Sequence, residues 1–107
     1  MSSGFKEREE GNEAKLKHDS DVHFRIQARR DKLLGEWVAK QMGLEGEAAT
    51  NYAIDLVKAD IQEPGDDDVL KKIMTDFKAH GVDQSEESIS QRMAEFESIA
   101  TEQLQGE

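Results

Sequence analysis

The sequence predicts an all-α protein, a compact four-helix bundle with a flexible N-terminal arm. Apolar residues recur at three- and four-residue steps in four successive segments, and short connections rich in glycine, proline, aspartate or serine separate these segments. No segment shows the apolar–polar alternation of a half-buried strand. Since 107 residues suffice for one core, we expect a single bundle over residues 19–107 and an arm over residues 1–18.

The longest predicted helix spans Asp21–Met42 and holds the only tryptophan. Asp19, Ser20 or Asp21 can accept hydrogen bonds from the free amides at its start, and Gly43 can adopt the left-handed conformation that closes a helix. At about 1.5 Å per residue, this helix could cross a small domain from end to end. We expect its buried face to comprise Val22, Ile26, Leu33, Leu34, Trp37, Val38 and Met42.

A second amphipathic helix is predicted over Glu47–Ile61. Its small residues Ala48, Ala49 and Ala53 would let it lie close to the long helix. Tyr52 lies on the apolar stripe, so we expect its ring in the core and its hydroxyl at the solvent. The full stripe is Ala49, Tyr52, Ala53, Leu56, Val57 and Ile61.

The run Pro64–Asp68 predicts a turn followed by a third helix, Asp67–His80, with aspartates at its cap and in its first turn. A calcium-binding loop starting at Asp66 is the alternative. It is disfavoured because apolar or basic residues would fall where that loop needs a glycine or an oxygen ligand. The expected buried residues of this helix are Leu70, Ile73, Met74 and Phe77.

A fourth helix is predicted over Glu86–Leu104, with Ser85 as its N-cap and acidic residues in its first turn. His80, beside Gly81, is interpreted as a cation that favours the C-terminal end of the third helix. The apolar stripe of the fourth helix comprises Ile89, Met93, Phe96, Ile99 and Ala100.

The charge of the chain narrows its possible partners. With 24 acidic residues and a formal net charge of −10, most of the surface would repel nucleic acid and anionic lipid. No apolar run approaches the roughly 18 residues of a membrane span, and no hydrophobic signal core opens the chain. Cysteine is absent, which fits a reducing compartment. We expect a soluble, cytoplasmic protein that neither binds nucleic acid nor inserts into a membrane.

The only basic cluster lies on the long helix, at Arg25, Arg29, Arg30 and Lys32. In so acidic a chain, the favoured interpretation is that these side chains pair with neighbouring carboxylates. The alternative is a weak site for an anion or a nucleotide phosphate.

No pattern in the sequence predicts catalysis or a metal centre. There is no cysteine nucleophile, phosphate-binding glycine loop or HExxH motif. His18 and His23 are five residues apart and so do not share the helix face that a metal pair would prefer. We expect neither catalytic residues nor metal ligands, and no enzyme.

Residues 1–18 mix both charges densely around few apolar side chains. Phe5, Asn12 and Leu16 would fall close to one stripe of a helix, but Gly11 in a helix interior costs about 1 kcal/mol relative to alanine. This composition suits a segment that becomes helical against a partner. The alternative is a solvated leader without a function.

Several segments resemble the zeta inhibitor subunit of the alphaproteobacterial rotary ATP synthase, a family also catalogued as a small domain of unknown function. The resemblance covers essentially the whole chain. It rests on Ala28–Trp37, with the sequence ARRDKLLGEW, on Met42–Leu44, on Tyr52–Ala53, and on Ala59–Asp60 followed by Glu63–Val69, with the sequence EPGDDDV.

The resemblance implies a four-helix bundle whose N-terminal segment inhibits ATP hydrolysis. It implies that residues 1–18 enter the catalytic head between an alpha and a beta subunit, near the gamma subunit, become helical there and block hydrolytic rotation. It also implies a cytoplasmic protein held at the inner membrane through the ATP synthase. The positions that match the family pattern, or that we expect to contact the partner, are Phe5, Arg8, Glu9, Glu13, Lys15, Leu16, His18 and Asp19.

Two features qualify the implied function. Gly11–Asn12 replaces a bulkier residue of strongly inhibitory members, which implies weaker inhibition. Some members are associated with weak ADP or ATP binding, which here would draw on the basic cluster. The alternative function is therefore a small helical adaptor or nucleotide-sensing bundle with weak or no ATPase inhibition.

Overall fold

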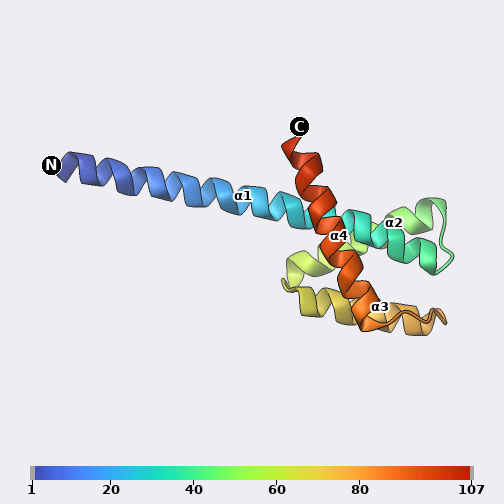
Figure 1. The fold of residues 1–107 in the computed structure, drawn as a ribbon. Helices are drawn as coiled ribbons and strands as arrows, with labels where there is room; N and C mark the ends of the chain where they lie inside the picture. The colour runs from blue at the N-terminus through green and yellow to red at the C-terminus, as the bar shows by residue number, and fades with distance from the viewer. Residues whose placement is uncertain (1, 107) are drawn as a thin grey trace.

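The computed structural model describes the backbone of residues 2–106 and the side chains of residues 21–106. The described residues form four helices and no strand, which confirms the predicted all-α class (Figure 1). In chain order the helices are α1 (Ser2–Gln41), α2 (Gly46–Gln62), α3 (Asp66–Ala79) and α4 (Glu86–Gln105).

Helix α1 is the central element of the fold. It packs against both α2 and α4, and α3 packs against the same two helices. The N-terminal half of α1 runs out past the other three helices, so the chain measures 65 × 26 × 22 Å (Figure 1). In the part of the chain that the structure describes, no helix combines the length and the apolar character needed to cross a bilayer.

The start of α1 differs from the prediction. The helix begins at Ser2 rather than near Asp21, so the proposed caps at Asp19, Ser20 and Asp21 do not mark its start. The preceding residues are rich in lysine, glutamate and arginine, which are good helix formers, and they include no proline. The predicted flexible arm, residues 1–18, lies outside the residues whose side chains are described. The division into arm and bundle stays a prediction.

The core collects the predicted apolar stripes of all the helices. Trp37 meets Phe77 edge to face, with 5.9 Å between the ring centroids. Two predicted core residues are instead largely exposed, Ile61 at 53% and Ile99 at 40%. Ile61 lies in the last turn of α2, beside an open pocket, and Ala100 is fully buried in place of its neighbour Ile99. The central cluster consists of Leu34, Val38, Leu56, Val69, Ile73, Phe77, Ile89 and Met93.

The hydroxyl of Tyr52 does not simply reach solvent, as predicted, but donates a hydrogen bond of 2.6 Å to Asp76 Oδ2. The same oxygen accepts a 3.0 Å bond from Lys72 Nζ, and burial together with this carboxylate raises the pKa of Tyr52. Sequence reasoning missed the bond because its two partners lie on different helices. It ties α2 to α3.

The predicted helix ends are largely confirmed. Ser85 Oγ accepts a 3.0 Å hydrogen bond from the amide of Ser88, as an N-cap should. At the end of α1, Gly43 has φ 81°, and the amide of Leu44 bonds the carbonyl of Ala39 at 2.8 Å. The reversal therefore needs the left-handed conformation that glycine adopts easily.

The ends of α3 differ in one detail. Its N-cap is Gly65, which has no side chain, so none of the aspartates in the first turn caps the helix. At the other end, His80 Nδ1 lies 2.9 Å from the carbonyl oxygen of Asp76. A carbonyl can only accept, so Nδ1 carries a hydrogen, in agreement with the predicted placement at the C-terminal end of the helix.

Helices α1 and α2 approach most closely at Gly35. A Cβ atom built there would lie 2.6 Å from Ala53 Cα and 3.0 Å from Ala53 Cβ. We expect Gly35→Ala to lower the free energy of unfolding by about 1–3 kcal/mol, because the helices must separate. Helix propensity alone predicts the opposite sign, a gain of about 1 kcal/mol. Urea denaturation, monitored by circular dichroism, decides between the loss and the gain of stability. A stabilised variant would refute the close packing.

Candidate functional site

A cluster of aspartates around the buried Arg30 joins three helices. Arg30 and Asp31 on α1 are each only 1% exposed. The guanidinium donates to Asp31 Oδ1 from Nε at 3.1 Å and from Nη2 at 2.9 Å, and to Asp66 Oδ1 from Nη1 at 2.8 Å. Nη2 also lies 3.5 Å from Asp60 Oδ2. Arg30 therefore links α1 to the last turns of α2 and the first turn of α3.

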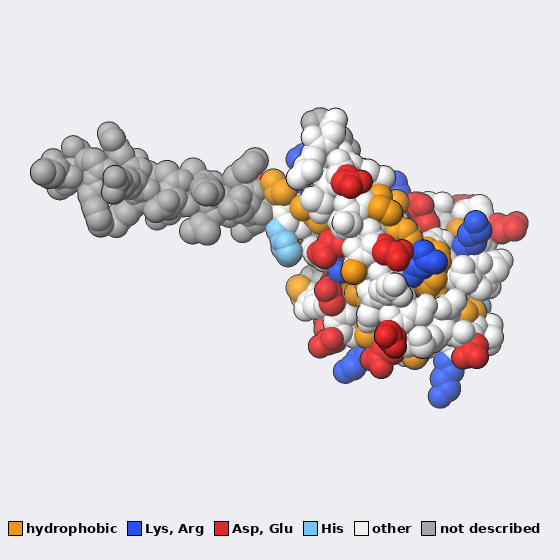
Figure 2. Space-filling model, in the orientation of Figure 1, with side chains coloured by type: hydrophobic (Ala, Val, Ile, Leu, Met, Phe, Trp, Pro, Cys, Tyr) orange, Lys and Arg blue, Asp and Glu red, His pale blue; other side chains and the backbone are white. Residues whose placement is uncertain are grey.

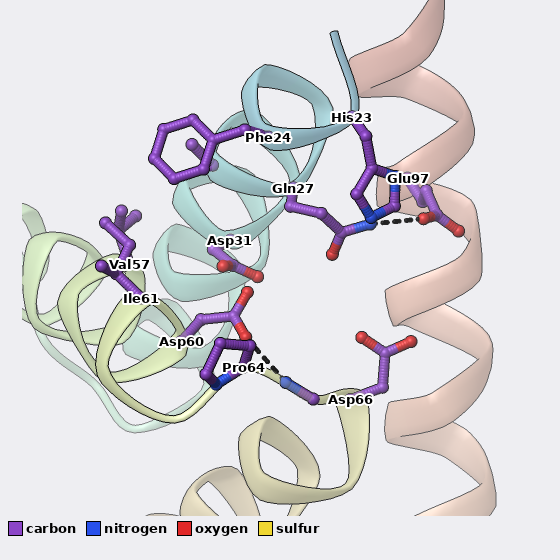
Figure 3. Close-up of a pocket in the computed structure, with 12 residues that line it drawn as sticks. His23, Phe24, Gln27, Asp31, Val57, Asp60, Ile61, Pro64, Asp66 and Glu97 are labelled. Carbon is purple, nitrogen blue, oxygen red and sulfur yellow. Dashed lines mark hydrogen bonds between the residues drawn. The ribbon is translucent and has the colours of Figure 1, made fainter. Parts of the chain in front are cut away.

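Asp31 is held in an unusual protonation state. Burial raises its pKa to about 8, and a hydrogen bond with the Asp60 carboxyl acts in the same direction, while Arg30 opposes both. At neutral pH Asp31 therefore keeps a proton. Asp31 and Asp60 face a pocket (Figure 3).

The pocket in front of this cluster, here called the end pocket, has a volume of about 720 Å³. Figure 3 shows Phe24, Val57 and Ile61 on one side and the hydrogen-bonded pair Gln27 and Glu97 on the other, with Gln27 Nε2 2.8 Å from Glu97 Oε1. One wall is thus apolar and the other polar and acidic. The remaining lining residues are His23, Ala28, Asp31, Asp60, Pro64, Gly65 and Asp66.

A second hollow, here called the basic groove, has a volume of about 770 Å³ and shares Phe24, Ala28 and Val57 with the end pocket. Its lining brings together three of the four predicted basic residues and adds a fourth, Lys58 of α2. Apolar residues, among them Ile54 and Leu104, lie beside them. The charged lining residues are Arg25, Arg29, Lys32, Lys58 and Glu36.

The structure thus divides the predicted basic cluster. Arg30 pairs with the buried Asp31 and the exposed Asp66, as the favoured interpretation predicted, and does not line the groove. Arg29 lines it and also donates from Nη1 to Gln103 Oε1 at 3.0 Å. Sequence reasoning missed Lys58 because only the packing of α2 on α1 brings it there.

One local signal could have revealed the buried position of Arg30. It lies four residues after Ile26 and four before Leu34, on the apolar face of α1. A charged residue in that register needs buried partners. The exposed Phe24, at 55%, had no comparable signal.

The remaining predictions concern the N-terminal arm and metal binding. The arm residues expected to contact a partner, from Phe5 to His18, lie outside the residues whose side chains are described, as does Asp19, which matches the family pattern. Within residues 21–106, no group of three or more histidine, aspartate or glutamate side chains is placed to hold a metal ion.

Four helices, one of which runs out beyond the others, define a small all-α protein, and its two hollows have apolar and charged lining residues. The model of a protein family described as ATPase inhibitor subunit zeta matches residues 1–103, so the chain belongs to the family of ATPase inhibitor zeta subunits. No curated protein matches the chain.

A solved structure supports the fold. It is a protein determined by NMR in solution that is 34% identical to this chain, with a TM-score of 0.70; the match covers 79% of this chain and 96% of the other. Membership of an inhibitor-subunit family implies a regulatory protein that associates with an ATP synthase.

Proposed function

We propose that this protein inhibits ATP hydrolysis by inserting residues 1–18 between an alpha and a beta subunit of the ATP synthase head, next to the gamma subunit. The arm, helical in the complex, blocks rotation in the hydrolytic direction. The observation that carries the proposal is the family match over residues 1–103, which includes the whole arm. The course of α1 supports it, because the N-terminal end of this helix extends beyond the other helices (Figure 1).

The rest of the proposal follows from this role. The protein acts by occupying a site on a partner, so it needs no catalytic residue and no metal of its own. It works in the cytoplasm, at the inner membrane only through the ATP synthase. The arm residues that make the contact are Phe5, Arg8, Glu9, Glu13, Lys15, Leu16 and His18.

Deleting residues 1–18 is expected to abolish inhibition of the purified cognate ATPase, because the bundle alone does not enter the catalytic interface. ATP hydrolysis is measured at increasing concentrations of the full and the shortened chain. The substitution Ile99→Ser, at an exposed position on α4, is the matched control and should inhibit like the unchanged protein. Equal inhibition by the shortened chain would move the function to the bundle.

A second candidate function is nucleotide sensing, which the basic groove favours. Arg25, Arg29, Lys32 and Lys58 could meet phosphates while Phe24 and Ile54 offer apolar contact to a base. We expect ADP to shift the backbone amide signals of these residues and to bind weakly, since no glycine loop cradles the phosphates. Lys58→Glu should weaken the shifts. Shifts spread evenly over the protein, or none, would exclude this site.

A further inference from the structure

The end pocket leaves large apolar side chains uncovered on two helices. Phe24 of α1 is 55% exposed and Ile61 of α2 is 53% exposed, and Val57 and Pro64 line the same pocket. Single exposed apolar residues are common on protein surfaces. Two that border one hollow of about 720 Å³ form a surface that a partner could cover.

The charged residues of the end pocket indicate the charge of the group that would bind there. Its lining includes Asp60, Asp66 and Glu97 but no lysine or arginine. Arg30 lies behind this lining, 1% exposed, and its guanidinium is engaged with three aspartates. Among the lining residues, His23 alone has a side chain that can carry positive charge. A cation entering the pocket meets carboxylates, whereas an anion would be repelled.

Figure 2 shows acidic side chains spread over the visible face of the body, some of them close to a histidine near the point where α1 leaves the body. The apolar and acidic walls of the end pocket face each other across a short space (Figure 3). A lysine or arginine suits such a pocket, because its aliphatic stem packs on apolar surface while its charged end meets carboxylates.

We propose that the end pocket docks a lysine or arginine side chain, flanked by an apolar residue, on the surface of the ATP synthase head. The inference rests on the function proposed above and adds a second contact to that of the arm. Phe24 follows residue 18 by six positions, or about 9 Å along a helix. A partner that holds the arm therefore lies close to the pocket.

The test compares opposite charges at one position of the full chain. Ile61→Lys places a cation at the pocket mouth, where it competes with the incoming basic residue, and is expected to weaken binding to the purified head by at least about tenfold. Ile61→Glu removes the same apolar contact but keeps the acidic character, and should weaken binding clearly less than Ile61→Lys. Affinity is measured by surface-immobilised titration, and circular dichroism verifies that each variant folds.

Ile99→Lys is the matched control, because it adds the same charge at an exposed isoleucine on α4 that lines neither hollow. It should bind like the unchanged protein. Equal weakening by Ile61→Lys and Ile61→Glu would overturn a basic occupant. If the unchanged protein binds and no Ile61 variant weakens it, the docking inference fails while the proposed function stands. If the unchanged protein does not bind the head, both fail.

Discussion

Replacing Arg30 by alanine is expected to lower the free energy of unfolding by about 2–4 kcal/mol, because a buried carboxyl loses its hydrogen bonds and a cavity is left, and this is a large part of the stability of a domain this small. The guanidinium contacts Asp31, Asp60 and Asp66. Without it, the buried carboxyl group of Asp31 loses two hydrogen bonds, and the carboxylates of Asp60 and Asp66 lose their cation. The variant should unfold at a much lower urea concentration than the unchanged protein, as followed by circular dichroism at pH 7.

Arg29→Ala is the control, since it removes the same side chain one position along α1. Arg29 bonds Gln103 at an exposed site, so its loss should lower the free energy of unfolding by no more than about 1 kcal/mol. A second variant separates the lost charge from the lost volume. Arg30→Met combined with Asp31→Asn should recover much of the stability. A cost below about 1 kcal/mol for Arg30→Ala would refute the structural role of the cluster.

The second large effect is a fall in stability as pH rises. In the folded protein the pKa of Asp31 is about 8, whereas an aspartate in the unfolded chain titrates near 4. Between these values the folded state binds more protons than the unfolded state, so the free energy of unfolding decreases with pH. The stabilisation is complete below pH 4 and lost as pH rises through about 8, by at most about 5 kcal/mol.

Asp31→Asn provides the comparison, because an amide resembles the protonated carboxyl and cannot ionise. We expect its stability to depend less on pH from 5 to 9 and to exceed that of the unchanged protein at pH 9. Urea denaturation at each pH measures both curves. Parallel curves would show that Asp31 does not hold its proton in the folded state.

The periodic part of the fold could be predicted from the sequence. Spacing of apolar residues located α2, α3 and α4 to within a residue at either end, and Ser85 and Gly43 marked a helix start and a helix end. These signals are local, since a helix repeats its contacts every three or four residues. The same logic failed for the start of α1, because the arm contains no residue that breaks a helix decisively.

The contents of the site could not be predicted in the same way. Arg30 meets Asp66, which lies 36 residues away in the sequence, and Lys58 reaches the basic groove only through the packing of α2 on α1. The exposure of Ile61 and Phe24 likewise depends on which surfaces the other helices cover. Such long-range placements are set by tertiary packing, which one sequence does not encode in any short pattern.

The position of α1 has a mechanical consequence. Residues 21–41 run through the centre of the body, and this stretch has no proline and no residue with positive φ. If a rotating shaft pulls on the arm, the tension passes along the helix axis to Leu34 and Val38 at the centre of the body. If the arm acts as proposed, no loop separates it from the buried residues of α1, so the load falls on the packing of the core and not on a linker.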